Sequence, residues 1–131
     1  MQETFKGVVV KGEGIAGRMY GVATANLNLH HDAPVKEGIY AAWVDIRGQR
    51  NPATICYGVE PEPKFEVHII DFSENIIGEE LTGEIVEKVS EYVHGYSPER
   101  LRQKILHDIE LCREILRNDN DNGNGNGNDD K

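Results

Sequence analysis

The sequence is poor in cysteine and contains no long hydrophobic run. Its 131 residues include two cysteines, Cys56 and Cys112, and no Cys-x-x-Cys pair, so neither a disulfide scaffold nor a cysteine-based zinc site is expected. No run of about 18 apolar residues occurs, and residues 1–6 do not place a basic segment before an apolar one. We therefore expect a cytoplasmic protein with no membrane partner.

Basic residues are also in the minority. The chain has 14 Lys and Arg side chains against 23 Asp and Glu, which gives a formal net charge of -9. Nucleic-acid-binding surfaces use clustered Lys and Arg to neutralise phosphates, so this balance predicts no nucleic-acid partner. It does not exclude a nucleotide bound with magnesium, because the metal neutralises much of the phosphate charge.

The sequence does contain a regular alternation of turns and short apolar segments. Between residues 5 and 85, Gly, Pro, Asn or Asp interrupts the chain every few positions, and the intervening segments are rich in β-branched and aromatic residues. The expected strands are residues 6–11, 23–29, 38–46, 51–58, 64–72 and 81–89. In the fifth strand Val67 alternates with Glu66 and His68, which places Glu66 on the opposite face from Val67. A hairpin turn is expected at residues 47–49.

Beyond the last expected strand the hydrophobic period changes to that of a helix. Ser97 is a favourable N-cap, and Pro98 suits the first helical position. Apolar residues then recur at spacings of three or four at Leu101, Ile105, Ile109, Cys112 and Leu116. We predict a helix over 98–116 that completes one domain of residues 1–117 and lays this stripe on the sheet. Residues 118–131 carry no apolar side chain and are predicted to form a disordered Asn/Asp/Gly tail.

Residues 12–17 spell Gly-Glu-Gly-Ile-Ala-Gly, which matches the G-x-G-x-x-G pattern of dinucleotide-binding folds. That pattern must open a helix within a βαβ unit, whereas here it runs into the next expected strand, so a dinucleotide-binding fold is excluded. The glycines instead favour a loop whose backbone can approach phosphate closely. The residues of this loop expected to bind nucleotide are Gly12, Gly14, Gly17, Arg18 and Gly21. A simple cluster of β-turns is the alternative interpretation.

Thr24 and Asn26 follow the loop at positions i and i+2 of an extended segment, so their side chains project to the same side. The hydroxyl and the carboxamide both offer hard oxygen atoms. Magnesium favours such ligands together with phosphate oxygens and water, and kinase sites commonly supply one or two protein ligands. The pair is therefore predicted to bind Mg²⁺ and the nucleotide. The alternative is a pair of polar residues beside a turn, with no ligand.

The order and spacing of these motifs resemble the riboflavin kinase family. The matching segments are Gly17-Arg18-x-x-Gly21-x-x-Thr24-Ala25-Asn26, Gly38-Ile39-Tyr40-Ala41, Glu66-Val67-His68-Ile69-Ile70-Asp71-Phe72, Gly78, Leu81 and residues 101–108. The resemblance covers about residues 6–116 and implies a mainly β fold, a six-stranded antiparallel Greek-key β-barrel with a C-terminal α-helix. It also implies a stand-alone riboflavin kinase domain, and we expect a monomer.

The reaction that the resemblance implies is transfer of the γ-phosphoryl group of ATP to the ribityl 5′-hydroxyl of riboflavin, which yields FMN and ADP. Matched by position, Glu66 is the catalytic residue that accepts the proton of the attacking hydroxyl. Thr24 and Asn26 would contact Mg²⁺ and the nucleotide phosphates, and the loop of residues 12–21 would close over them. The expected small-molecule partners are thus riboflavin or FMN and ATP or ADP, with Mg²⁺ as the cofactor.

Three departures from the family pattern keep a second interpretation open. Ala23 replaces a family proline, the segment 58–65 is shorter than its family counterpart, and Ser90 aligns with a family arginine. No arginine occurs between Arg50 and Arg100. The alternative is a catalytically weak or inactive relative that binds a flavin or nucleotide as a sensor or carrier.

Overall fold

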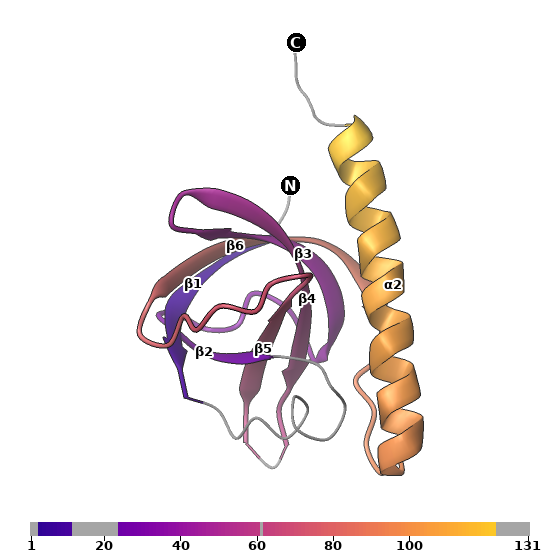
Figure 1. Cartoon of the computed structure of the whole chain (residues 1–131). Coiled ribbons are helices and arrows are strands. Elements are labelled where there is room, and N and C mark those ends of the chain that lie inside the picture. The colour runs from indigo at the N-terminus through magenta and orange to yellow at the C-terminus, as the bar shows by residue number, and fades with distance from the viewer. Residues whose placement is uncertain (1–2, 12–23, 61, 123–131) are drawn as a thin grey trace.

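The computed structural model describes residues 3–11, 24–60 and 62–122. Within them the elements are β1 (Glu3–Val10), β2 (Ala25–Leu29), β3 (Gly38–Ile46), β4 (Gln49–Gly58), β5 (Lys64–Ile69), β6 (Glu80–Ser90) and α2 (Pro98–Asn122). All strand pairs are antiparallel, and the order around the closed barrel is β1-β2-β5-β4-β3-β6. Strands β3, β4 and β5 form a meander, and β2 pairs with β5, which is a Greek-key arrangement. The predicted six-stranded Greek-key barrel with a C-terminal helix is confirmed (Figure 1).

The barrel wall has two apolar faces. The inner face forms the main core, in which the least exposed large side chains include Phe5, Val9, Ile55, Val67 and Leu81. The outer face carries a smaller cluster under α2, made up of Ala41, Trp43, Ile70, Ile109, Cys112 and Leu116. Because neighbouring residues of a strand point to opposite faces, β3 contributes to both clusters and is buried along almost its whole length.

Two strand ends are set by residues with a left-handed backbone. Arg47 and Gly48 have φ angles of 53° and 83° and form the two-residue turn between β3 and β4, which confirms the predicted hairpin. Strand β5 ends at Ile69 rather than at residue 72, because Asp71 has a φ of 60° that a continuing strand does not allow. The other strand ends in the described residues fall within three residues of the predicted positions.

Helix α2 ends later than predicted. The expectation that residues 118–131 form a disordered tail is wrong for residues 118–122, which are helical. The physical reason is a tertiary contact: the indole Nε1 of Trp43 donates a hydrogen bond to Asp119 Oδ2 at 2.7 Å. Extending an existing helix also needs no new nucleation. Residues 123–131 lie outside the described residues.

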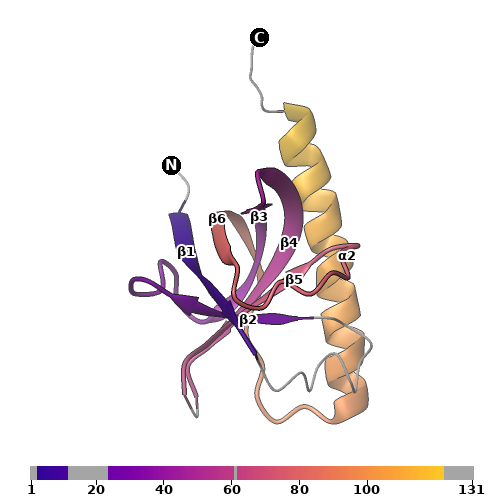
Figure 2. The same cartoon turned by 60° about the vertical axis from the view of Figure 1, so that its left-hand side comes forward.

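Helix α2 runs along one side of the barrel beside β3 and β4, and its last turns extend past the barrel (Figure 1 and Figure 2). Ser97 caps the helix as predicted, because its hydroxyl oxygen accepts the amide of Arg100 at 3.3 Å. Arg113 Nη1 donates to Asp71 Oδ2 at 2.7 Å, which ties the middle of the helix to the end of β5. In the part of the chain that the structure describes, no helix is both long and apolar enough to cross a membrane.

We expect Ile109→Ala to lower the free energy of unfolding by about 2–5 kcal/mol. Ile109 is buried in the cluster between α2 and the barrel, so truncation leaves a cavity there. Urea denaturation followed by circular dichroism measures the change. The control is Ile77→Ala, because Ile77 is 56% exposed and its truncation should change the free energy by less than about 0.5 kcal/mol. Equal losses in the two variants would contradict this packing.

Candidate active site

Four strands bring functional side chains together on the outer face of the barrel. In one row of cross-strand pairs, Asn26 of β2 lies opposite Glu66 of β5, Glu66 lies opposite Cys56 of β4, and Cys56 lies opposite Ile39 of β3. The sequence neighbours of Asn26 and Glu66 face the core, so both polar side chains point outward. The predicted orientation of Glu66 relative to Val67 is confirmed.

A pocket lies between this row and helix α2. Its cavity volume is about 50 Å³, and about 430 Å³ when all the space between atoms out to the open mouth is counted. Its lining residues are Thr24, Ile39, Thr54, Cys56, Glu66, His68, Ile105, Asp108 and Ile109. The isoleucines give it an apolar wall, while Glu66 and Asp108 place one carboxyl group on the barrel side and one on the helix side. An apolar pocket with a few converging polar groups is the usual form of a small-molecule site.

The structure brings three of the predicted site residues together. Thr24 and Glu66 both line the pocket, and Asn26 is paired with Glu66. Val10 at the end of β1 pairs with Asn26, so the end of β1 lies beside the site. The predicted nucleotide-binding residues that lie outside the described residues are Gly12, Gly14, Gly17, Arg18 and Gly21. Their role stays a prediction, and Ala23 also lies outside the described residues.

A buried charged cluster on the helix side of the pocket was not predicted. Asp108 is 4% exposed, and its Oδ2 lies 2.5 Å from Lys104 Nζ and accepts the Ser90 hydroxyl at 3.0 Å. Lys104 Nζ also donates to Ser90 Oγ at 2.7 Å. Ser90 is the position at which the sequence lacks an expected arginine, and Lys104 supplies a cation there. The available signal was an aspartate between Ile105 and Ile109 on the apolar stripe, with a lysine four residues before it.

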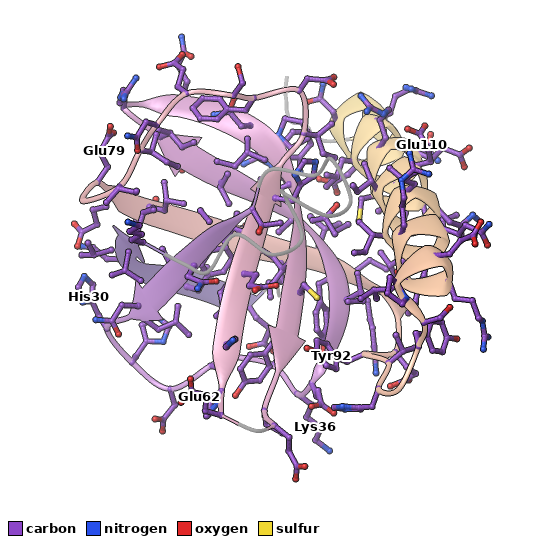
Figure 3. All side chains as sticks on the ribbon, turned by 60° about the horizontal axis from the view of Figure 1, so that its bottom comes forward. His30, Lys36, Glu62, Glu79, Tyr92 and Glu110 are labelled. Atoms are coloured by element: carbon purple, nitrogen blue, oxygen red, sulfur yellow. The ribbon has the colours of Figure 1, made fainter. Side chains whose placement is uncertain are left out.

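Burial and negative charge raise the pKa values of two side chains near Glu66. Burial raises the pKa of the Cys56 thiol to about 12, and the charge of Glu66 adds to this rise. Burial also raises the pKa of Tyr92, with further contributions from Cys56 and Glu66. Tyr92, labelled in Figure 3, packs against Gly58, where an added Cβ would lie 2.4 Å from the ring. Both groups stay protonated near neutral pH, so neither a thiolate nor a phenolate competes with Glu66 as a base.

The side-chain oxygens of Thr24 and Asn26 fit a magnesium ion that is bound together with phosphate. Magnesium usually keeps water and phosphate ligands and takes only one or two from protein. Among the described residues, no group of three or more His, Cys, Asp or Glu side chains could hold a metal ion. The role of Thr24 and Asn26 as magnesium ligands stays a prediction.

The sequence matches the flavokinase family, described as riboflavin kinase, over residues 2–116. A bifunctional riboflavin kinase/FMN adenylyltransferase from Pseudomonas fluorescens is 31% identical over 115 residues, which cover 83% of this chain and 37% of that protein. An RNA-binding riboflavin kinase from Bacillus subtilis is 30% identical over 109 residues, which cover 79% of this chain and 46% of that protein. The chain thus spans less than half the length of these curated relatives.

A solved structure shows a similar fold. The crystal structure of riboflavin kinase from Trypanosoma brucei matches with a TM-score of 0.67 at 20% identity, over 88% of this chain and 80% of that one. This likeness supports the barrel with its closing helix. The Bacillus relative is named as RNA-binding, and the absence of a nucleic-acid partner therefore stays a prediction for this chain.

We expect the Cys56 thiol to resist alkylation in the folded protein. With a pKa of about 12 instead of about 9, roughly one thiol in ten thousand is ionised at pH 8, compared with roughly one in ten in the unfolded chain. Labelling by iodoacetamide, followed by peptide mass spectrometry, should be at least about 100-fold slower without urea than with it. A rate within tenfold of the unfolded chain would contradict the raised pKa of this thiol.

Proposed function

Because the chain belongs to the riboflavin kinase family, we propose that it transfers the γ-phosphoryl group of ATP to the ribityl 5′-hydroxyl of riboflavin, producing FMN and ADP. One observation carries the proposal: Glu66 lines the pocket together with Thr24 and lies directly opposite Asn26. A base and the phosphate-binding groups must lie within reach of one hydroxyl for this reaction, and that arrangement supports it.

In the proposed reaction Glu66 accepts the proton of the 5′-hydroxyl as this group attacks the phosphoryl group. A primary alcohol is a weak nucleophile at neutral pH, and a positioned carboxylate contributes about 10²- to 10⁴-fold to the rate. Asn26 on the neighbouring strand β2 and Thr24 just before it orient the nucleotide phosphates. Magnesium bound there would neutralise charge on the transferred phosphoryl group.

The walls of the pocket support a flavin as the acceptor. Ile39, Ile105 and Ile109 offer apolar contacts to an aromatic ring system, whereas Glu66 and Asp108 suit a hydroxylated side chain. A molecule that is apolar at one end and carries several hydroxyl groups at the other matches both parts. Riboflavin has this composition.

The proposal also includes the conditions under which the reaction takes place. We take the protein to act in the cytoplasm as a monomer, with Mg²⁺ as the cofactor and without a nucleic-acid partner. The net charge of -9 supports the last point, because such a surface repels phosphate backbones. The ligand set of Thr24 and Asn26 supports magnesium over a softer metal.

We expect Glu66→Gln to reduce the rate of FMN formation by about 10²- to 10⁴-fold, because the variant keeps the size of the side chain and removes the base. The protein is incubated with riboflavin, ATP and Mg²⁺, and FMN is measured by chromatography. Glu110→Gln is the matched control, since Glu110 is an exposed residue of α2 (labelled in Figure 3) and its replacement should leave the rate unchanged. Wild-type FMN formation no greater than that of Glu66→Gln would refute the kinase proposal.

We expect Thr24→Val to weaken Mg-ATP binding by about 3- to 10-fold without changing the fold, because valine keeps the shape of threonine and removes one oxygen ligand. Isothermal titration calorimetry with Mg-ATP in the absence of riboflavin measures the dissociation constant. Thr82→Val is the control, since Thr82 is an exposed residue of β6 and takes no part in the pocket. Equal affinities of Thr24→Val and the wild type would exclude Thr24 as a ligand.

A further inference from the structure

Thr54 has a buried hydroxyl group without a hydrogen-bond partner. The residue is 7% exposed, and among the described residues no donor or acceptor meets its Oγ1 at hydrogen-bond distance and geometry. Burial raises the pKa of the Cys112 thiol, and a weak hydrogen-bonding interaction with the Thr54 side chain lowers it in part, although the two groups do not meet at hydrogen-bond distance and geometry. A thiol is a weak partner, however, and this one points its hydrogen at the Tyr40 carbonyl oxygen at 3.8 Å.

Such a group lowers the stability of the protein without a ligand. Buried hydroxyl groups are almost always hydrogen-bonded, because leaving one unpaired forfeits its interaction with water without replacing it. Valine would fit the same space on a β-strand and carry no such cost. Thr54 lines the pocket, so a bound molecule can supply the partner that the protein does not.

Thr54 and Glu66 are diagonal neighbours on the outer face of the barrel. Cys56 pairs with Glu66, His68 pairs with Thr54, and all four side chains line the pocket. Diagonal neighbours on adjacent strands lie roughly 7–8 Å apart at their Cα atoms. A molecule whose reacting hydroxyl lies at Glu66 therefore reaches Thr54 with a second polar group a few bonds further along its chain.

The other polar groups of the pocket indicate the chemistry of the group of the bound molecule that meets Thr54. Glu66 and Asp108 are hydrogen-bond acceptors when ionised, and Asp108 is already held by Lys104 and Ser90. Carboxylates favour an occupant that donates hydrogen bonds. A chain of hydroxyl groups can donate to the carboxylates and also exchange a hydrogen bond with the threonine hydroxyl.

We propose that Thr54 is a specificity-determining residue that hydrogen-bonds a secondary hydroxyl of the ribityl chain of riboflavin. This inference rests on the proposed function and adds to it the part of the acceptor that the pocket recognises. Thr54 does not take part in the proton transfer, which belongs to Glu66. Its hydroxyl selects flavins with a hydroxylated side chain over flavins with a short alkyl group in its place.

The test compares Thr54→Val with Thr54→Ser, which restores the hydroxyl, and measures binding of two flavins by calorimetry. Riboflavin carries the ribityl chain, and lumiflavin has the same ring with a methyl group in its place. We expect Thr54→Val to bind riboflavin about 3- to 10-fold more weakly than the wild type and to bind lumiflavin equally well. Thr54→Ser should recover most of the riboflavin affinity. Without ligand, Thr54→Val should melt at the same temperature as the wild type or higher.

Two results would overturn the inference. One is an unchanged ratio of riboflavin to lumiflavin affinity in Thr54→Val, which would assign the partner of Thr54 to water or to the ring. The other is a lower melting temperature together with equal losses for both flavins, which would show that the hydroxyl serves packing against Cys112.

The binding measurement also separates this inference from the proposed reaction. If the wild type binds riboflavin but forms no FMN, the kinase proposal fails, and the affinity ratio still decides the role of Thr54. If the wild type forms FMN and Thr54→Val keeps the wild-type affinity ratio, the kinase proposal stands and the inference about Thr54 fails. A wild type that binds neither flavin overturns both.

Discussion

The position of the site depends on the two-residue period of strand β5. Phe65, Val67 and Ile69 fill the inside of a closed barrel, so Glu66 and His68 have to point outward. A shift of one residue in the pairing of β5 would carry the carboxyl group of Glu66 into an apolar core, where an unpaired charge is strongly unfavourable. The packing of the core therefore fixes the register of β5 and with it the outward position of Glu66.

A side chain that points outward from a barrel ordinarily contacts solvent. Here helix α2 covers part of the outer face and forms a pocket there. The helix covers the outer face of β3 and β4, and its residues Ile105, Asp108 and Ile109 form the second wall of the pocket. One apolar stripe thus has two roles: it packs on the outer cluster through Ile109, Cys112 and Leu116, and it lines the pocket through Ile105 and Ile109. The pocket exists only where the helix is docked.

Local periodicity in the sequence was enough to predict the strands, the start of the helix and the orientation of Glu66, because these features depend on neighbours in the chain. The features that were missed depend on residues far apart in sequence. Asp119 gains its partner from Trp43, and Lys104 comes to lie beside Ser90 only after α2 has docked. The missing hydrogen bond of Thr54 could not be predicted either, since it is defined by what surrounds the residue in the folded chain. The loop of residues 12–21 remains a prediction from sequence, as it lies outside the described residues.

Trp43, which donates a hydrogen bond to Asp119, is an intrinsic fluorescent probe of the contact between the helix and the barrel. Trp43 is the single tryptophan in the sequence, and its ring lies in the layer between barrel and helix, with the Arg50 guanidinium 4.5 Å from its centroid. The barrel core contains phenylalanine and tyrosine but no tryptophan among the described residues. Tryptophan emission from this chain therefore reports on the outer layer alone. The emission spectrum therefore reports on the packing of the helix against the barrel, which is the contact that builds the pocket.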